Sequence, residues 1–373
     1  MKYYVIAGEA SGDLHGANLI KAIKRKDSIA EFRCWGGDLM KEQGCCVVKH
    51  YKDLAFMGFV EVLFNLKTIL SNFKFCKKDI VFYKPDVVIL IDYPGFNLKM
   101  ASFVKQLNIP VYYYISPQIW AWKQGRVKKI KRIVDKMFVI LPFEKDFYKK
   151  FNFDVEFVGH PLLDAMNDDC YKSEMIPFRN ENNISDKKII AILPGSRKQE
   201  ILKMLPIMLS VVEHFPDYEF VIAGVSFLPK EMYENIILNK PVKIVFGKTY
   251  PLLYNSYAAI VTSGTATLET ALFGVPEIVC YKGSNISFML AKKLVKVNYI
   301  SLVNLIANKE IVKELIQNDF NKERLIAELT KILENENREQ MKSSFMELKK
   351  MLGSGSASDK TANIITNSLM FGK

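Results

Sequence analysis

The sequence predicts an α/β protein built from two doubly wound domains, and three observations support this prediction. Short apolar runs typical of buried parallel strands recur through both halves of the 373-residue chain. Segments of helical length separate these runs, which is the rhythm of wound α/β domains. Residues 167–188 are polar and without period, as expected of a linker. We therefore expect domains over residues 1–166 and 186–352, and a hinge with a terminal helix over 353–373.

The amino-acid composition restricts the classes of binding partner that we expect. The 52 basic and 40 acidic residues give a formal charge of +12, which favours nucleic acid, phosphorylated substrates or an acidic membrane surface. The sequence lacks nucleic-acid-binding motifs, so nucleic acid is not expected. Six cysteines without a CxxC pair predict reduced thiols, with neither a zinc site nor a disulfide framework. The sequence shows no signal peptide and no apolar run long enough to cross a bilayer, so we expect a cytoplasmic protein.

The first predicted strand covers residues 2–7, and the turn GEASGD follows it. Its glycines do not match the G-x-G-x-x-G pattern of dinucleotide-binding folds. Small residues still let a ligand approach the backbone around Ser11 and Gly12. Glu9 and Asp13 suit hydroxyl recognition better than a phosphate cradle.

Residues 54–70 carry too many apolar side chains for one core-facing stripe. This segment is either a helix buried on two sides or an exposed apolar face that reaches lipid. Basic residues follow at Lys67, Lys74, Lys77 and Lys78, and they favour the lipid interpretation.

Residues 85–92 form a continuous apolar run that ends in Asp92, as expected of a central parallel strand. Ligands of open α/β sheets sit beyond the carboxyl ends of strands. Desolvation there raises the basicity of a carboxylate, so Asp92 is a candidate general base, with a structural cap as the alternative.

A strand over residues 111–115 precedes Trp120, Trp122 and a helix with a basic face. That face is either simply solvated or part of a membrane interface rich in phosphate groups. Further strands are expected at residues 137–141 and 155–158.

The second half begins with a strand at residues 188–193, followed by Gly195, Ser196 and Arg197. A turn of this composition offers backbone N–H groups, a hydroxyl and a guanidinium to a phosphate. Strands at residues 219–223 and 242–246 follow.

Residues 259–281 read as strand, small-residue turn, short helix and strand. Ser263 or Thr265 can cap the helix, and Gly264 lies between them, so the first turn is a candidate diphosphate site. Glu269 is then placed to accept ribose hydroxyls. The alternative is an ordinary strand–turn–helix unit. Near the end of the chain, residues 353–356 form a hinge, and Ser358 or Asp359 is expected to cap the last helix.

Two wound halves with a nucleotide signature in the second suggest a GT-B glycosyltransferase, with a cleft between its domains. The sequence resembles the lipid-A-disaccharide synthase family over nearly its whole length. The resemblance is carried, in order, by GEASGD, MGFVEVL, PDVVILID, SPQIWAW, LPFEKDFY, GHPLLD, LPGSR, SGTATLE and LVKVNYISLVNLIA.

This resemblance implies transfer of 2,3-diacylglucosamine from UDP-2,3-diacylglucosamine to 2,3-diacylglucosamine 1-phosphate, giving a β-1,6 disaccharide 1-phosphate and UDP with inversion. It implies Asp92 as base and Arg197 beside the departing UDP. The implied roles of other residues fall into three sets. Gly195, Ser196, Ser263, Gly264, Thr265, Glu269 and Asn304 would bind the donor. Glu9, Ser11, Gly12 and Asp13 would face the acceptor. Met57, Phe59, Val60, Leu63, Phe64, Trp120 and Trp122 would contact acyl chains or the membrane.

The family often carries a second Asp at the position of Gly95, so Asp92 is the carboxylate retained here. The resemblance implies no cofactor and no metal, peripheral attachment to the anionic inner membrane, and a C-terminal segment that can exchange between the subunits of a homodimer. Another UDP-sugar enzyme of the same fold, a peptidoglycan N-acetylglucosaminyltransferase or a 2-epimerase, is the alternative.

Overall fold

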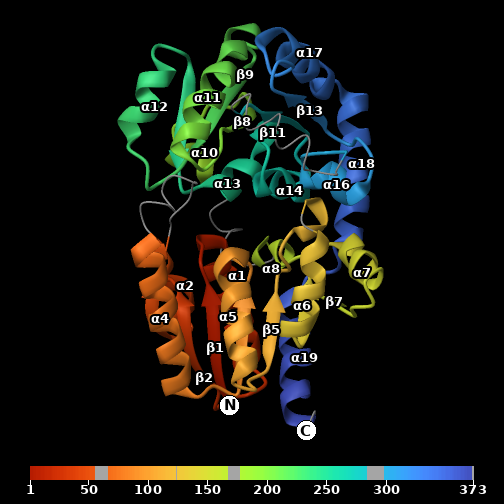
Figure 1. Cartoon of the computed structure of the whole chain (residues 1–373). Coiled ribbons are helices and arrows are strands. Elements are labelled where there is room, and N and C mark those ends of the chain that lie inside the picture. The colour runs from red at the N-terminus through yellow and green to blue at the C-terminus, as the bar shows by residue number, and fades with distance from the viewer. Residues whose placement is uncertain (55–65, 123, 167–176, 284–297, 372–373) are drawn as a thin grey trace. The chain divides into compact units, whose positions relative to one another are not determined.

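The computed structural model describes residues 1–54, 66–122, 124–166, 177–283 and 298–371. The chain divides into two compact units (Figure 1). The first domain combines Met1–Ala165 with Leu352–Lys373, and the second domain is Met166–Met351. Each is built on one parallel sheet, as the sequence predicted.

The first domain has a seven-stranded sheet in the order β3-β2-β1-β4-β5-β6-β7. Its strands are β1 (Lys2–Ala7), β2 (Glu31–Gly36), β3 (Cys46–His50), β4 (Val87–Ile91), β5 (Val111–Tyr114), β6 (Lys136–Val139) and β7 (Glu156–Phe157). The strand order reverses between β1 and β4, whose last residues Ala7 and Ile91 are paired. The segments after these two strands therefore flank the switch point at which open α/β sheets bind ligands.

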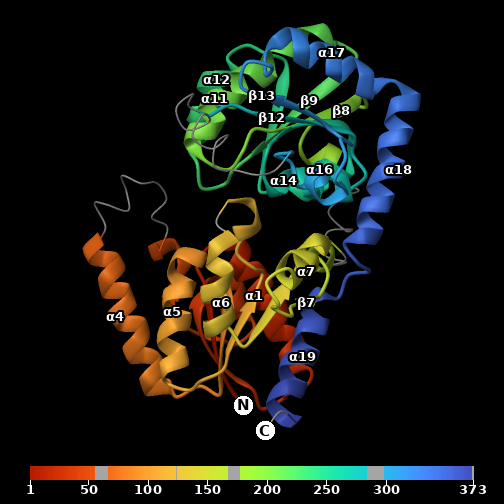
Figure 2. The same cartoon turned by 45° about the vertical axis from the view of Figure 1, so that its right-hand side comes forward.

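Helices cover both faces of this sheet. They are α1 (Ala10–Lys24), α2 (Asp38–Glu42), α4 (Leu66–Tyr83), α5 (Pro94–Gln106), α6 (Val127–Ile133), α7 (Pro142–Lys149), α8 (Leu162–Met166) and α19 (Ala357–Phe371). Side chains of α1 and α19 pack on β1, β4 and β5 in one apolar cluster. The helices α4, α5 and α6 lie over the opposite face (Figure 2).

The C-terminal helix α19 is anchored to the first domain of its own chain. The Asp164 carboxylate accepts the backbone N–H groups of Ala357 at 2.9 Å and Ser358 at 2.8 Å. It supplies the N-terminal cap that the sequence assigned to Ser358 or Asp359, and that assignment was wrong. The sequence offered no local signal, because the capping carboxylate comes from 193 residues upstream.

The second domain has a six-stranded sheet in the order β10-β9-β8-β11-β12-β13. Its strands are β8 (Lys188–Leu193), β9 (Tyr218–Gly224), β10 (Val242–Phe246), β11 (Ser256–Thr262), β12 (Glu277–Tyr281) and β13 (Lys313–Ile316). Its helices are α10 (Phe178–Glu181), α11 (Lys198–Met208), α12 (Lys230–Ile237), α13 (Thr249–Tyr254), α14 (Thr265–Leu272), α16 (Leu302–Ala307), α17 (Lys322–Leu333) and α18 (Asn335–Met351). Here the order reverses between β8 and β11.

Two buried apolar clusters hold this domain together. Side chains of α11, α12 and α17 pack against one face of the sheet. Those of α10 and α13 pack against the other, and both faces are therefore covered, as parallel sheets require. The continuous apolar sequences of β8 and β11 follow from this burial.

The structure corrects the prediction about cysteines. Cys34 on β2 and Cys45, just before β3, form a disulfide, with their Cα atoms 6.3 Å apart. Of the other cysteines that the structure describes, Cys46 is exposed, and Cys76 and Cys280 are buried. A separation of 11 residues with no motif gave the sequence no reason to predict this pair.

Candidate active site

Asp92 follows β4 at the switch point of the first domain, and its backbone is unusual. Asp92 and Tyr93 have φ angles of 43° and 49°, both in the left-handed region. Each such residue costs on the order of 1–3 kcal/mol, and strain of this kind persists where the surroundings impose it. The Tyr113 hydroxyl and the Asn97 amide impose it here, donating to the Asp92 carbonyl oxygen at 2.6 and 2.8 Å.

The Asp92 carboxyl group is partly buried, and its pKa is raised to about 6. Burial is the main cause, and the negative charge of Glu9 adds to it. A carboxylate of this basicity is suited to accept a proton near neutral pH.

A pocket of about 300 Å³ lies beside Asp92. Its lining comes from the segments that follow three neighbouring strands, β4, β5 and β6. It is lined by Asp92, Pro94, Ile115, Ser116, Gln118, Trp122, Ile140, Leu141 and Glu144. Ile115 has a φ of 66°, a rare conformation for a β-branched residue, so a second strained position borders the pocket.

Glu144 is a second carboxyl group in this pocket, and its sequence context predicted no role for it. It is almost fully buried on the first turn of α7, and it accepts hydrogen bonds from the N–H groups of Ile140 at 3.2 Å and Leu141 at 2.9 Å. The Ser116 hydroxyl also donates to it. Burial outweighs these bonds and raises the pKa of Glu144 to about 7. Like Asp92, both Ser116 and Glu144 follow a strand closely, and this placement is the signal that could have identified them.

The four residues predicted to face the acceptor follow β1, and the structure separates their roles. Glu9 is partly exposed and Ser11 is exposed. Gly12 is buried, and a Cβ atom there would lie 3.1 Å from the Cβ atom of Ala7, so it allows α1 to pack on β1. The buried Asp13 carboxylate accepts three backbone N–H groups, from Gly37, Leu39 and Met40.

Asp13 therefore holds the turn into α2, and any effect of Asp13 on the acceptor would be transmitted by that turn. Gly95, the position at which the resemblance implies a second Asp, is exposed. A Cβ atom at Gly95 would meet no described atom within 4 Å. The structure therefore leaves room for a side chain at this position.

In the second domain, two turns flank the switch point between β8 and β11. Gly195 follows β8 with a φ of 111°, a conformation that favours glycine. A Cβ atom there would lie 2.8 Å from a Glu200 carboxylate oxygen and 3.6 Å from a methyl carbon of Thr262 on β11. The exposed Ser196 and Arg197 complete the turn, and the Arg197 guanidinium lies 3.5 Å from Glu200.

The second turn leads from β11 into α14. Gly264 is the N-cap residue of α14, so the prediction that Ser263 or Thr265 caps this helix was wrong. The Ser263 hydroxyl instead donates to the carbonyl of Ile300 at 3.1 Å, and Thr265 is exposed. An eight-residue helix with a glycine cap leaves its first N–H groups to a ligand or to water.

Glu269 lies on α14, partly exposed, and accepts a hydrogen bond from the Tyr250 hydroxyl at 3.1 Å. Burial raises the pKa of its carboxyl group, and the Tyr250 bond opposes that shift. Tyr250 on α13 thus orients the carboxylate predicted to accept ribose hydroxyls, a contact the sequence did not suggest.

Asn304, also predicted at the donor site, is fully buried on α16. Its amide nitrogen donates to Val312 and Glu314, and its amide oxygen accepts from Ile311 and Val312. This side chain has satisfied its hydrogen-bonding capacity within the domain. Asn304 would contribute to a donor site only indirectly, by fixing the backbone at Ile311 and Val312.

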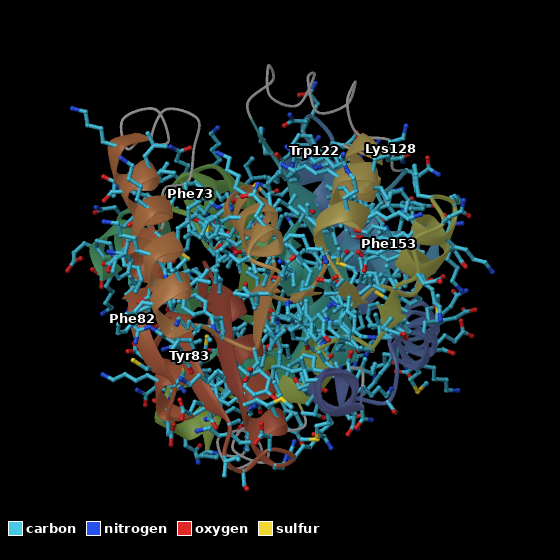
Figure 3. All side chains as sticks on the ribbon, turned by 60° about the horizontal axis from the view of Figure 1, so that its bottom comes forward. Phe73, Phe82, Tyr83, Trp122, Lys128 and Phe153 are labelled. Atoms are coloured by element: carbon cyan, nitrogen blue, oxygen red, sulfur yellow. A yellow bond between two sulfur atoms is a disulfide. The ribbon has the colours of Figure 1, made fainter. Side chains whose placement is uncertain are left out.

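The residues predicted to contact lipid divide into three groups. Met57, Phe59, Val60, Leu63 and Phe64 lie outside the described residues. Trp120 is only 8% exposed and packs edge-on against Phe143, so it offers little surface for the predicted contact with acyl chains or the membrane. Trp122 is 51% exposed and lies at the loop before α6 (Figure 3).

Helix α4 also exposes apolar side chains, among them Leu70 and Phe82, which are 59% and 80% exposed. Figure 3 shows Phe82 on this helix together with Phe73 and Tyr83. Within the described ranges, no helix has the length and hydropathy required to span a bilayer.

Two doubly wound domains, each built on one parallel sheet, form the architecture of the GT-B fold. The solved structure of UDP-GlcNAc 2-epimerase from Neisseria meningitidis, bound to UDP-GlcNAc, superimposes with a TM-score of 0.66. It shares 15% sequence identity over 99% of this chain and 100% of that chain, which is a likeness of fold.

The sequence comparisons are more specific. The profile of the lipid-A-disaccharide synthetase family matches residues 3–367. Lipid-A-disaccharide synthase from Syntrophus aciditrophicus is 41% identical over 96% of this chain and 95% of its own length. The synthase from Trichlorobacter lovleyi is 37% identical over 97% and 96%. The chain belongs to the lipid-A-disaccharide synthase family and is a glycosyltransferase.

Proposed function

We propose that this protein transfers 2,3-diacylglucosamine from UDP-2,3-diacylglucosamine to carbon 6 of 2,3-diacylglucosamine 1-phosphate, releasing UDP. Family membership over nearly the whole chain supports this reaction over those of other UDP-sugar enzymes. The observation that carries the mechanism is Asp92, a strained and partly buried carboxylate beside a pocket at the switch point.

Asp92 acts as the general base in this mechanism. Its carboxylate takes the proton of the acceptor's 6-hydroxyl while the oxygen attacks the anomeric carbon of the donor. The bond from that carbon to the UDP oxygen breaks at the same time, so the configuration inverts. A pKa of about 6 leaves Asp92 mostly ionised at pH 7 and still basic enough to share a proton in the transition state.

The second domain holds the donor and stabilises its departing diphosphate. The backbone N–H groups at the start of α14 and the Gly195–Arg197 turn flank one switch point, where negative charge is favoured. Arg197 stabilises the charge that develops on UDP, and groups in such positions contribute most in the transition state. Glu269, oriented by Tyr250, accepts the ribose hydroxyls.

The protein reaches its acylated substrates by peripheral attachment to an anionic inner-membrane surface. Exposed apolar side chains of α4 and the half-exposed Trp122 support this, together with the net charge of +12. Each Lys or Arg near such a surface contributes roughly 1 kcal/mol, so a few suffice for reversible attachment. Homodimer formation belongs to the same proposal and follows from the family resemblance.

The test is a transfer assay with both lipid substrates and a chelator, comparing the wild type with Asp92→Ala. We expect transfer by the wild type and its loss in the variant, with thermal stability as the check on folding. Activity that survives in Asp92→Ala would retain the enzyme and reject the base. No transfer by the wild type would reject the proposed reaction itself.

A further inference from the structure

The pocket beside Asp92 has a lining that selects for a particular part of a substrate. All of its lining residues belong to the first domain. Asp92 and Glu144 are the ionisable groups among them, and no described lysine or arginine contributes to the wall. The Asp92 carboxylate, with no described cation beside it in the wall, disfavours a phosphate. The pocket is therefore suited to an uncharged group.

Hydrogen bonds inside the pocket fix which atoms a ligand can use. Glu144 already accepts from two backbone N–H groups and from the Ser116 hydroxyl. Because Ser116 donates its proton to Glu144, its oxygen is left as an acceptor for a ligand hydroxyl. Asp92 is a second acceptor, and the exposed Gln118 amide offers both a donor and an acceptor.

The remaining wall is apolar. Pro94, Ile115 and Leu141 contribute aliphatic surface, and Trp122 adds an aromatic ring that is 51% exposed. An apolar wall with a few convergent polar groups is the usual composition of a small-molecule site. A hexopyranose ring presents C–H groups on its faces and hydroxyls around its edge, so it complements this lining and its volume of about 300 Å³.

Building on the proposed function, we propose that this pocket binds the hexosamine ring of the acceptor and leaves the acceptor's phosphate outside. Trp122 lies against the C–H face of the ring, and Ser116 and Gln118 hydrogen-bond its polar groups. Glu144 is a positioning residue, because it orients the Ser116 hydroxyl. Asp92, on the same wall, then faces the hydroxyl that reacts.

The experiment measures acceptor and donor KM for Ser116→Ala, Gln118→Ala and Trp122→Leu. Matched controls are Ser102→Ala and Gln106→Ala on α5, which do not line the pocket. Each variant is assayed with 2,3-diacylglucosamine 1-phosphate and with the same lipid lacking its phosphate. Calorimetric binding of the acceptor without donor provides a readout that does not need transfer.

We expect each pocket variant to raise acceptor KM about tenfold, the loss typical of one hydrogen bond or ring contact, with donor KM unchanged. The same fold-change should appear with the phosphate-free acceptor, and the controls should resemble the wild type. A pocket effect that disappears without the phosphate would show that the pocket holds the phosphate, and would overturn the proposal. A change in donor KM, or an unchanged acceptor KM in the pocket variants, would also overturn the proposal.

Failure of the proposed function has a different signature. Wild-type protein that binds the acceptor but does not transfer would reject the reaction, while weaker acceptor binding by Ser116→Ala would still support the pocket. Wild-type protein that neither transfers nor binds the acceptor would reject both.

Discussion

Glu9 raises the pKa of the Asp92 carboxyl group through its negative charge, adding to the larger effect of burial. The two residues follow β1 and β4, the strands between which the order of the first sheet reverses. The switch point thus brings together a proposed base and a charge that increases its basicity, from positions more than eighty residues apart in the sequence.

This pairing predicts a pH dependence. Because Asp92 acts only when ionised, kcat/KM for the acceptor should rise with pH through a midpoint near 6. Glu9→Gln removes a negative charge, so the Asp92 pKa and the midpoint should both move to lower pH. Glu31→Gln, on the exposed start of β2, is the matched control and should leave the profile in place. An identical midpoint in Glu9→Gln would contradict the coupling.

Arg197→Ala should lower kcat by about 10²- to 10³-fold, the loss typical of a group that stabilises transition-state charge. The side chain is exposed, so thermal stability should hardly change. Arg324→Ala, an exposed arginine of the second domain, serves as control. Steady-state kinetics measure kcat for the wild type and both variants, and an unchanged kcat in Arg197→Ala would remove Arg197 from the mechanism.

Asp164→Ala should destabilise the protein by about 1–2 kcal/mol, because two N–H groups at the start of α19 lose their acceptor. Asp359→Ala removes an exposed ion pair with Arg25 and a carboxylate from the first turn of α19, which together should cost about 0–1 kcal/mol. Urea denaturation measures both. If Asp359→Ala destabilised the protein more than Asp164→Ala, the cap of α19 would come from Asp359 and not from Asp164.

Glu277→Met should stabilise the protein, and more so at high pH. Glu277 lies on β12 with no exposed surface, and neither carboxylate oxygen has a described hydrogen-bond partner. Burial raises its pKa well above the usual value, so the folded state holds a proton that the unfolded state releases above about pH 4.5.

Wild-type stability should therefore fall by up to about 1.4 kcal/mol per pH unit from that point up to the folded-state pKa. Methionine does not titrate, so the stability of the Glu277→Met variant should not show this fall with pH. Melting temperatures at pH 5 and pH 8 test this, and a difference between the two proteins that does not widen at pH 8 would contradict it.

The central strands could be predicted from the sequence because burial on both faces leaves an uninterrupted apolar run, as in β4 and β8. Three strands nearer the sheet edges, β2, β3 and β13, were missed because each includes charged or polar residues. Asp92 could be proposed from its place at a strand end.

Contacts between distant segments could not be predicted in this way. Asp13, Asn304 and Asp164 each have side chains that fit a ligand site, and only the structure shows that backbone N–H groups occupy them. Ser116 and Glu144 lie in motifs that the sequence displayed, but their pairing depends on the adjacency of β5 and β6.

The anchoring of α19 by Asp164 has a consequence for synthesis on the ribosome. The second domain is continuous in the sequence, whereas the first domain takes its last helix from the end of the chain (Figure 1). Once residues 166–351 of the nascent chain have emerged from the ribosome, the second domain can fold completely while the first domain still lacks α19. Until residues 357–371 emerge, the apolar surface of α1 against which α19 packs remains uncovered. The domain that begins first is therefore the domain that finishes last.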